Sequence, residues 1–256
     1  MLFYLLAPYA DQFQVFNLFR YLTFRTGGAL MTGLFLSFLL GPAIIKWLKS
    51  QQGAGQPIRA GGSEPIFAKA DAPAMGGFLI LLALCLSTLL WADLMNAYVR
   101  ILMFVTIGLG AVGFADDYLK LSRRKVHALS GKVKLALGVG IAGLAGWFAM
   151  NMGGPGLAVP FLKDMPVPVG VVLVSFAIIV IVVALNAANR TDARAMVPVM
   201  IAAACFGFVA YLASSATFAS ALKIVYVPGT GELAVFCGAL IGASLGFLRR
   251  TTAGRG

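Results

Sequence analysis

Charged residues are what this sequence has least of. Only 11% of its 256 residues are charged, whereas 60% are hydrophobic. An ordinary globular domain has about 25% charged residues, and a mean hydropathy of +0.92 leaves too little polar surface to cover a particle in water. The hydrophobicity excludes a disordered chain, and three cysteines without pairing or metal-ligand spacing exclude a disulfide scaffold. The composition therefore predicts a polytopic membrane protein.

Seven apolar runs are close to the length of about twenty residues that an α-helix needs to cross roughly 30 Å of hydrocarbon. Their approximate limits are 26–48, 74–92, 97–115, 134–151, 167–186, 196–214 and 232–248. The runs are continuously apolar and do not alternate, so helices are expected in place of barrel strands. The predicted fold class is an all-α membrane helical bundle with about seven transmembrane helices.

The basic residues predict the orientation of these spans. Of the 20 Lys and Arg residues, 15 fall in one set of connections and 5 in the other. Because Lys and Arg are enriched in cytoplasmic loops, the first set is expected in the cytoplasm and the N-terminus outside. The net charge of +11 then fits anionic lipid headgroups better than nucleic acid.

Six of the nine acidic residues separate into two groups. Asp93, Asp164 and Glu232 lie in or beside outward loops, where they are expected to be solvated. Asp116 and Asp117 directly follow the third run, and Asp192 follows the fifth. The predicted orientation brings these last three to the cytoplasmic boundary of the hydrocarbon, where a carboxylate is costly unless it has a partner.

The adjacent carboxylates of Asp116 and Asp117 indicate a candidate site for a metal ion and for catalysis. Adjacent carboxylates repel unless a cation lies between them, and oxygen ligands without a His or Cys cluster suit a hard ion such as Mg²⁺. In a helix, Asp116 and Lys120 would share a face, with Asp117 turned by about 100°. One carboxylate could then hold metal while the other handles a proton or acts as nucleophile. The alternative is an Asp–Lys pair that only marks the helix end.

The segment 120–134 carries six cations and the single histidine, His127. Such a strip could hold a diphosphate, but charge alone favours ordinary positive-inside anchoring. Glycine patterns at 108–113 and 138–143 match a dinucleotide fingerprint, yet they lie inside apolar runs, so helix packing is expected. Gly238, Gly242 and Gly246 are expected to serve the same purpose.

Two sequence motifs, and the order in which they occur, resemble those of a known protein family. They are Asp-Asp-Tyr-Leu-Lys at 116–120 and Asn-Ala-Ala-Asn-Arg-Thr-Asp at 186–192, separated by the basic segment and an apolar run. Further matching stretches are 56–59, 73–77, 90–93, 197–202 and 226–240. In these segments the chain resembles the polyprenyl-phosphate sugar-1-phosphate transferases of bacterial membranes, and the likeness covers nearly everything up to Phe247.

The resemblance implies a fold, a reaction and its partners. The family has ten spans and a cytoplasmic, Mg²⁺-dependent site in the bacterial inner (plasma) membrane. The branch that this chain is most similar to moves phospho-MurNAc-pentapeptide from UDP-MurNAc-pentapeptide to undecaprenyl phosphate, which yields lipid I and UMP. That step belongs to peptidoglycan synthesis, and hence to cell-wall biogenesis, cell shape and cell division. A homodimer is a further implied partner.

The resemblance also assigns residues by motif. Catalytic roles fall to Asp116, Asp117 and Asp192, and Mg²⁺ would be held by Asp117 and Asp192. Substrate contacts on the same basis are Lys120, Lys134, Asn186 and Asn189. Whether an Asp attacks covalently or deprotonates the lipid phosphate is left open by the sequence.

Several departures from the family's pattern bear on activity. Residues 71–77 lack two threonines of the family's loop, and 189–195 is shorter and lacks the second Asp, which resembles a uracil-side contact. The likeness stops at Leu248, so we expect one transmembrane domain over 1–248 and an unmatched basic tail over 249–256. The family's later metal Asp, His-rich loop and three spans have no counterpart, which predicts C-terminal truncation. The alternative function is therefore a catalytically inactive remnant or a lipid-carrier-binding membrane protein.

Overall fold

The computed structural model describes residues 14–52, 76–123, 130–150 and 196–253, together with Leu2 and Leu5. Within these ranges the regular structure is helical: η2 (Gln14–Arg20), α2 (Leu22–Gln52), α3 (Gly76–Trp91), α4 (Ala97–Arg123), α5 (Gly131–Met150), α7 (Met196–Ala213), α8 (Ala216–Leu222) and α9 (Glu232–Ala253). By length and composition α2, α4, α5, α7 and α9 can each span a membrane, and α3 is a shorter apolar helix. The predicted all-α membrane bundle is confirmed, and the run 167–186 lies outside the described residues.

Four helices extend beyond the predicted apolar limits, and one of them, α5, begins at Gly131, three residues before its limit. Helix α2 begins at Leu22, so Arg25 lies inside the helix and not before it. Helix α4 continues past its apolar run to Arg123, and α9 continues to Ala253. A hydropathy limit marks where apolar sequence stops, whereas backbone hydrogen bonding carries a helix into the headgroup region. The division at residue 248 stays a prediction.

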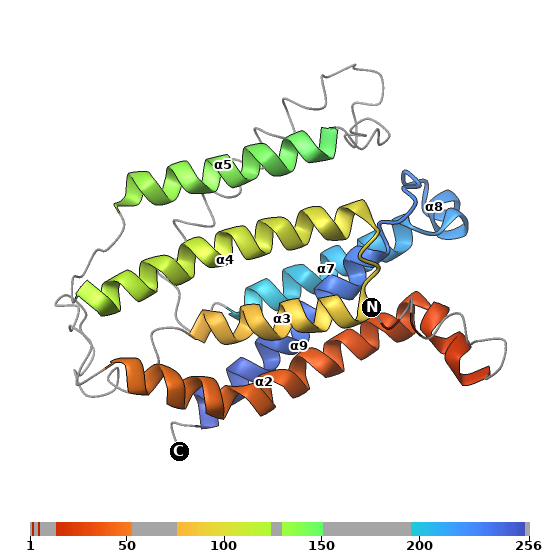
Figure 1. Cartoon of the computed structure of the whole chain (residues 1–256). Coiled ribbons are helices and arrows are strands. Elements are labelled where there is room, and N and C mark those ends of the chain that lie inside the picture. The colour runs from red at the N-terminus through yellow and green to blue at the C-terminus, as the bar shows by residue number, and fades with distance from the viewer. Residues whose placement is uncertain are drawn as a thin grey trace.

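Helices α2, α4 and α9 run in one direction and α3, α5 and α7 in the other, so the described bundle has two distinct ends (Figure 1). The Glu232 end gathers the first residues of α2, α4 and α9 and the last residues of α3, α5 and α7. The Asp116 end gathers the opposite termini of the same helices. Because Asp93 and Glu232 lie beside the helix termini of one end, and Asp116 and Lys134 beside those of the other, the two groups are separated, in agreement with the sides predicted for the connections.

Glycine lets α2 and α9 approach to backbone contact. A Cβ atom added at Gly238 would lie 2.7 Å from the Thr26 carbonyl oxygen, and one at Gly242 would collide with the Leu30 carbonyl oxygen. From the other helix, a Cβ at Gly33 would lie 2.8 Å from the Ala239 carbonyl oxygen. Small residues produce such close packing between membrane helices, where lipid supplies no hydrophobic drive. The predicted packing role of these α9 glycines is confirmed.

The glycine patterns on α4 and α5 have a mixed outcome. A Cβ at Gly108 would lie 3.2 Å from Ile141, and one at Gly110 would lie 2.5 Å from Leu81, so α4 packs closely on both α5 and α3. At Gly113, Gly140 and Gly143, nothing in the described part of the chain lies within 4 Å. Helix packing therefore accounts for the first two positions and stays a prediction for the other three.

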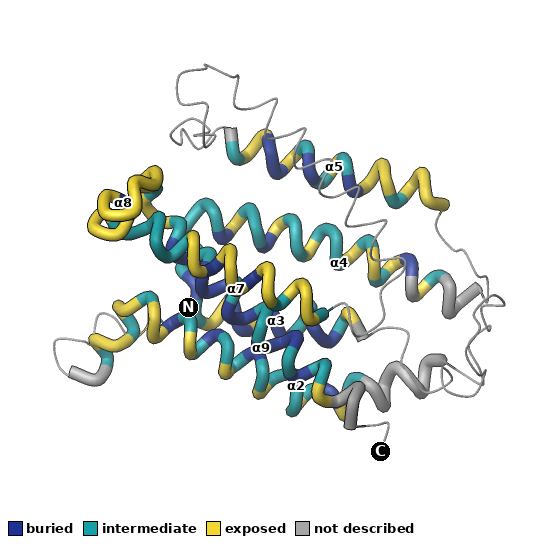
Figure 2. Tube along the Cα trace, turned by 180° about the vertical axis from the view of Figure 1, so that it is seen from behind, coloured by how far each residue is buried: buried dark blue, intermediate teal, exposed yellow. Residues whose placement is uncertain are grey.

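The core lies where α2, α3, α4 and α9 meet, and most exposed apolar side chains lie on outer faces (Figure 2). Two serine hydroxyl groups inside this core donate hydrogen bonds to carbonyl groups of neighbouring helices. Ser37 Oγ donates to the Ala243 carbonyl at 3.0 Å, and Ser87 Oγ donates to the Ala29 carbonyl at 2.6 Å. Large apolar residues such as Phe206 face outward instead, as expected for a surface covered by lipid.

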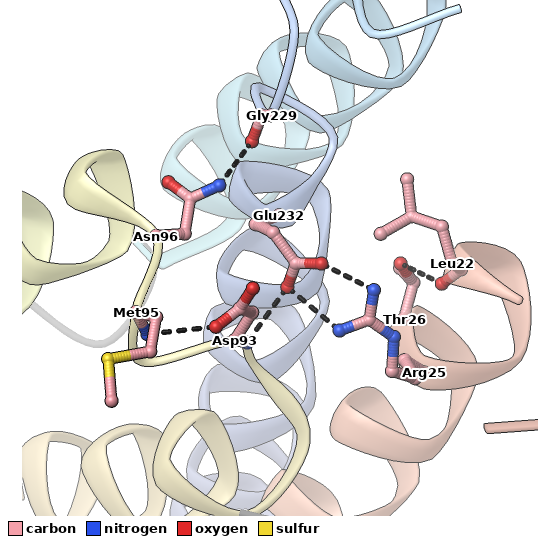
Figure 3. Close-up of polar contacts among 8 residues, drawn as sticks. All are labelled: Leu22, Arg25, Thr26, Asp93, Met95, Asn96, Gly229 and Glu232. Atoms are coloured by element: carbon pink, nitrogen blue, oxygen red, sulfur yellow. Dashed lines mark hydrogen bonds and ion pairs between the residues drawn. The ribbon is translucent and has the colours of Figure 1, made fainter. Parts of the chain in front are cut away.

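A buried ion pair joins the helices at the Glu232 end (Figure 3). Arg25 Nη1 donates to Glu232 Oε2 at 3.0 Å, and Nη2 donates to Oε1. The backbone N–H of Asp93 donates to the same Oε2 at 2.9 Å, so Glu232 connects α2, the α3–α4 connection and α9. The expectation that Glu232 is solvated is wrong, because it is only 8% exposed and a guanidinium and an amide replace its water.

Alanine at Gly242 is expected to separate α2 from α9, because its methyl group would occupy the position of the Leu30 carbonyl oxygen. We expect the free energy of unfolding to fall by about 1–3 kcal/mol, the usual cost of overpacking. Unfolding in mixed micelles, followed by far-ultraviolet circular dichroism, measures it. Gly140→Ala is the control, since no described atom lies within 4 Å of a Cβ added there, and equal losses in both variants would contradict the close contact.

Glu232→Gln is expected to remove the negative charge that binds both Nη groups of the buried Arg25 guanidinium. Breaking a buried pair on one side lowers the free energy of unfolding by about 3–5 kcal/mol, which the same micelle assay can measure. The double variant Arg25→Met with Glu232→Leu should recover much of this loss, because both charges of the pair are removed together. A double variant as unstable as the single one would show that the pair itself is not the cause.

Candidate active site

Asp116 lies where the apolar part of α4 ends. The membrane-spanning part of this helix is Ala97–Asp116, and the helix continues beyond it to Arg123. The Asp116 residue is only 4% exposed. A carboxylate at this depth loses most of its hydration, so it needs a charged or hydrogen-bonding partner from the protein.

Lys134 reaches the site from the first turn of α5. The Ser130 residue precedes this helix, and its carbonyl accepts hydrogen bonds from the N–H groups of Val133 at 3.0 Å and Lys134 at 3.2 Å. The Val133 N–H also lies 3.4 Å from Ser130 Oγ, a weak capping contact. This N-terminal turn holds the Lys134 backbone at the same end of the bundle as Asp116.

The two side chains form an ion pair. Lys134 Nζ donates to Asp116 Oδ2 at 2.5 Å, and the side chains are 20% and 6% exposed, respectively. A charge-assisted hydrogen bond of this kind offsets the cost of burying the carboxylate and fixes its orientation toward α5. The negative charge of the Asp116 carboxylate is therefore already balanced by the ammonium group of Lys134.

Aromatic rings join α3 to α4 beside the ion pair. The Phe78 and Phe114 ring centroids are 5.1 Å apart, and Phe114 and Tyr118 stack at 6.2 Å with an interplanar angle of 18°. Phe114 and Tyr118 lie one turn apart on α4, on the side opposite Asp116. The ring contacts with α3 and the ion pair with α5 together fix the rotation of α4.

The other predicted residues of the 116–120 motif are placed only in their backbone. Asp117 and Lys120 lie within α4, so the helical condition under which Asp116 and Lys120 share a face is met. Their side chains are outside the described part of the structure. The described partner of Asp116 is Lys134, which was expected as a substrate contact, and that substrate role stays a prediction.

Asp192, Asn186 and Asn189 lie outside the described residues, so their predicted roles stay predictions. Within the described ranges, no group of three or more His, Cys, Asp or Glu side chains could hold a metal ion. Asp116 has an ammonium partner and by itself does not fit a divalent cation. A hard-ion site fits the chain's chemistry if Asp117 and Asp192 add their carboxylate oxygens.

Sequence reasoning missed both buried ion pairs. Arg25 with Glu232 and Asp116 with Lys134 each connect residues from different helices. The sequence does place the two residues of each pair, which have opposite charges, at the ends of predicted transmembrane runs on the same side of the membrane. That placement indicates a shared level in the bilayer, but it does not indicate which helices are neighbours.

Comparison with known proteins agrees with the resemblance. The model of glycosyl transferase family 4 matches residues 99–253, which include Asp116, Asp117 and Lys134. A phospho-N-acetylmuramoyl-pentapeptide-transferase from Maricaulis maris is 50% identical over 261 residues, covering 97% of this chain and 71% of the relative. A protein of the same description from Granulibacter bethesdensis is 52% identical over 257 residues, with the same coverage of both chains. This chain therefore belongs to glycosyl transferase family 4, among the relatives of the phospho-N-acetylmuramoyl-pentapeptide-transferases.

Proposed function

We propose that this chain transfers phospho-MurNAc-pentapeptide from UDP-MurNAc-pentapeptide to undecaprenyl phosphate, releasing UMP and forming lipid I. The observation that carries the proposal is the buried Asp116–Lys134 pair at the boundary of the spanning region. It belongs to a chain about half identical to two proteins whose name describes the transfer of phospho-N-acetylmuramoyl-pentapeptide. A carboxylate at this depth lies where a soluble nucleotide sugar and the phosphate of a membrane lipid can meet.

The proposed reaction exchanges one phosphoanhydride for another. An oxygen of the lipid phosphate forms a bond to the β-phosphorus of the nucleotide sugar, while the bond from that phosphorus to the UMP oxygen breaks. Such transfers depend mainly on positioning and on compensating charge. Asp116, oriented by Lys134, is suited to accept a proton from the lipid phosphate, and Lys120, Asn186 and Asn189 are the proposed substrate contacts.

We further propose that Asp117 and Asp192 hold Mg²⁺. When bound there, the ion would supply charge neutralisation for the diphosphate. The ion pair of Asp116 supports this division of roles, because a carboxylate matched by Lys134 is a poorer metal ligand than one without a cationic partner. The oxygen-only donor set is the kind that Mg²⁺ prefers beside phosphates.

The Asp116 end is proposed to face the cytoplasm of a bacterial inner membrane. Described basic residues at this end include Lys132, Lys134 and Arg249, and the predicted cytoplasmic connections carry 15 of the 20 basic residues. The positive-inside rule assigns such an end to the cytoplasm. A nucleotide-sugar substrate made in the cytoplasm would then reach the site directly.

UMP release from UDP-MurNAc-pentapeptide by the chain in liposomes with undecaprenyl phosphate tests the proposed function. We expect release with Mg²⁺, loss of release after chelation, and recovery when Mg²⁺ is restored. Asp116→Asn should lower kcat by about 10²–10⁴-fold, the usual contribution of a side chain engaged in proton transfer. Chromatography of the released nucleotide measures this.

A chain that releases no UMP while it is folded would contradict the transferase proposal. Binding of radiolabelled undecaprenyl phosphate to the same liposomes or micelles then separates the alternatives. Saturable binding without turnover would support the lipid-carrier binder, and no binding would support the inactive remnant. Far-ultraviolet circular dichroism checks the fold in each preparation.

Lys134→Met should release Asp116 from its fixed orientation. We expect kcat to fall by about 10²-fold, the scale on which small misplacements slow an enzyme. Lys132→Met is the matched control, because Lys132 lies exposed on the same turn of α5 and loses the same charge. Equal effects of the two variants would show that net positive charge, not the ion pair, is what turnover needs.

A further inference from the structure

The connection between α7 and α9 carries an exposed apolar cluster. This connection, residues 214–231, contains α8 and is called the α8 hairpin below. Five of its large apolar side chains are each at least 38% exposed: Phe218, Leu222, Ile224, Val225 and Tyr226. Figure 2 shows α8 as an exposed segment at one end of the bundle. Exposed apolar clusters of this kind mark an interaction surface, because water would disfavour them.

The charge of the α8 hairpin indicates what that surface meets. Residues 214–231 contain no Asp or Glu, and their single charged side chain is Lys223. Apolar and aromatic side chains together with a cation are typical of segments that lie at the interface between headgroups and acyl chains. A surface for a water-soluble partner would more commonly have a charged rim on both sides of the patch.

The hairpin also pairs much of its own backbone. The N–H groups of Ala219 and Ile224 donate to the carbonyls of Ser215 and Ala219 at 2.9 and 3.0 Å. The N–H of Val227 donates to the Ala213 carbonyl at 3.0 Å, which closes the hairpin onto the end of α7. Lipid offers no hydrogen-bond partners, so a segment with paired N–H groups can enter the interfacial layer at low cost.

Neighbouring contacts hold the hairpin beside the lipid-covered surface of α7. Thr230 Oγ1 donates to the Ala210 carbonyl at 3.3 Å, and Asn96 Nδ2 donates to the Gly229 carbonyl at 2.8 Å (Figure 3). The rings of Tyr211 on α7 and Phe218 on α8 have centroids 6.3 Å apart. The exposed cluster is therefore continuous with the outward face of a membrane-spanning helix.

We propose that the α8 hairpin lies in the interfacial layer of the bilayer leaflet at the Glu232 end. Its apolar side chains are buried among the upper acyl chains, and the Lys223 ammonium faces the lipid phosphates. The hairpin thereby anchors the ends of α7 and α9 at a fixed depth. This inference concerns a lipid surface and does not depend on transferase activity.

Spin-label accessibility tests the proposal in the whole chain. Leu222→Cys and Val225→Cys are labelled separately in a chain whose three native cysteines are replaced by alanine. Liposomes of phosphatidylethanolamine and phosphatidylglycerol are used without any substrate. Collisions with oxygen report lipid, and collisions with a water-soluble nickel complex report water. Met95→Cys is the water control, because Met95 is 75% exposed at the same end, and Phe206→Cys, at a 72% exposed position within α7, is the lipid control.

Labels at 222 and 225 are expected about 5–10 Å below the lipid phosphates, with nickel access between the two controls. Nickel access equal to that at position 95 would overturn the proposal, because the hairpin would then stand in water. A label shielded from both oxygen and nickel would also overturn it, because that result means burial against protein. Since no substrate is present, failure of the transferase assay leaves this result unaffected.

Discussion

A buried charge in this bundle must have a partner of opposite charge, and that constraint organises both ends of the molecule. At one end Asp116 is matched by Lys134, and at the other Glu232 is matched by Arg25. Each pair joins helices that are distant in the sequence or separated by a basic connection. Desolvation makes an unmatched charge costly, so the pairs select one arrangement of the helices. At the Asp116 end the same constraint gives a carboxylate with a fixed orientation, which is the starting condition for the proposed chemistry.

Between these two ends, close packing of small residues holds the helices together, because lipid provides no hydrophobic effect to drive their association. The backbones of α2 and α9 approach because Gly33, Gly238 and Gly242 carry no Cβ atom. This close pair forms one side of the core, and α3 and α4 complete it. Helix α4 then meets α5 through Gly108 and the Asp116–Lys134 pair. The candidate site is thus built at the edge of the core, where an apolar helix pair ends in polar sequence.

The fold class could be predicted from the sequence because long apolar runs depend on composition alone, and six of the seven runs coincide with described helices. The ends of the helices could not be predicted in this way, because backbone hydrogen bonds continue the helices through charged residues such as Arg25 and through the segment after Asp116. The burial of Asp116 agrees with its predicted place at the boundary of the hydrocarbon, whereas its ion pair with Lys134 could not be predicted, because sequence spacing indicates only a local neighbour such as Lys120. Glu232 was misassigned to solvent, since hydropathy carries no information about a cation on another helix.

The central claim is that Asp116 and Lys134 act as a coupled pair, and a double-mutant cycle measures that coupling directly. Asp116→Asn, Lys134→Met and the double variant are compared by their free energies of unfolding in micelles. The account predicts a coupling free energy of about 1–3 kcal/mol, as expected for contacting residues, whether or not the chain turns over substrate. Additive effects within about 0.5 kcal/mol would contradict the account, because the two side chains would then be energetically independent.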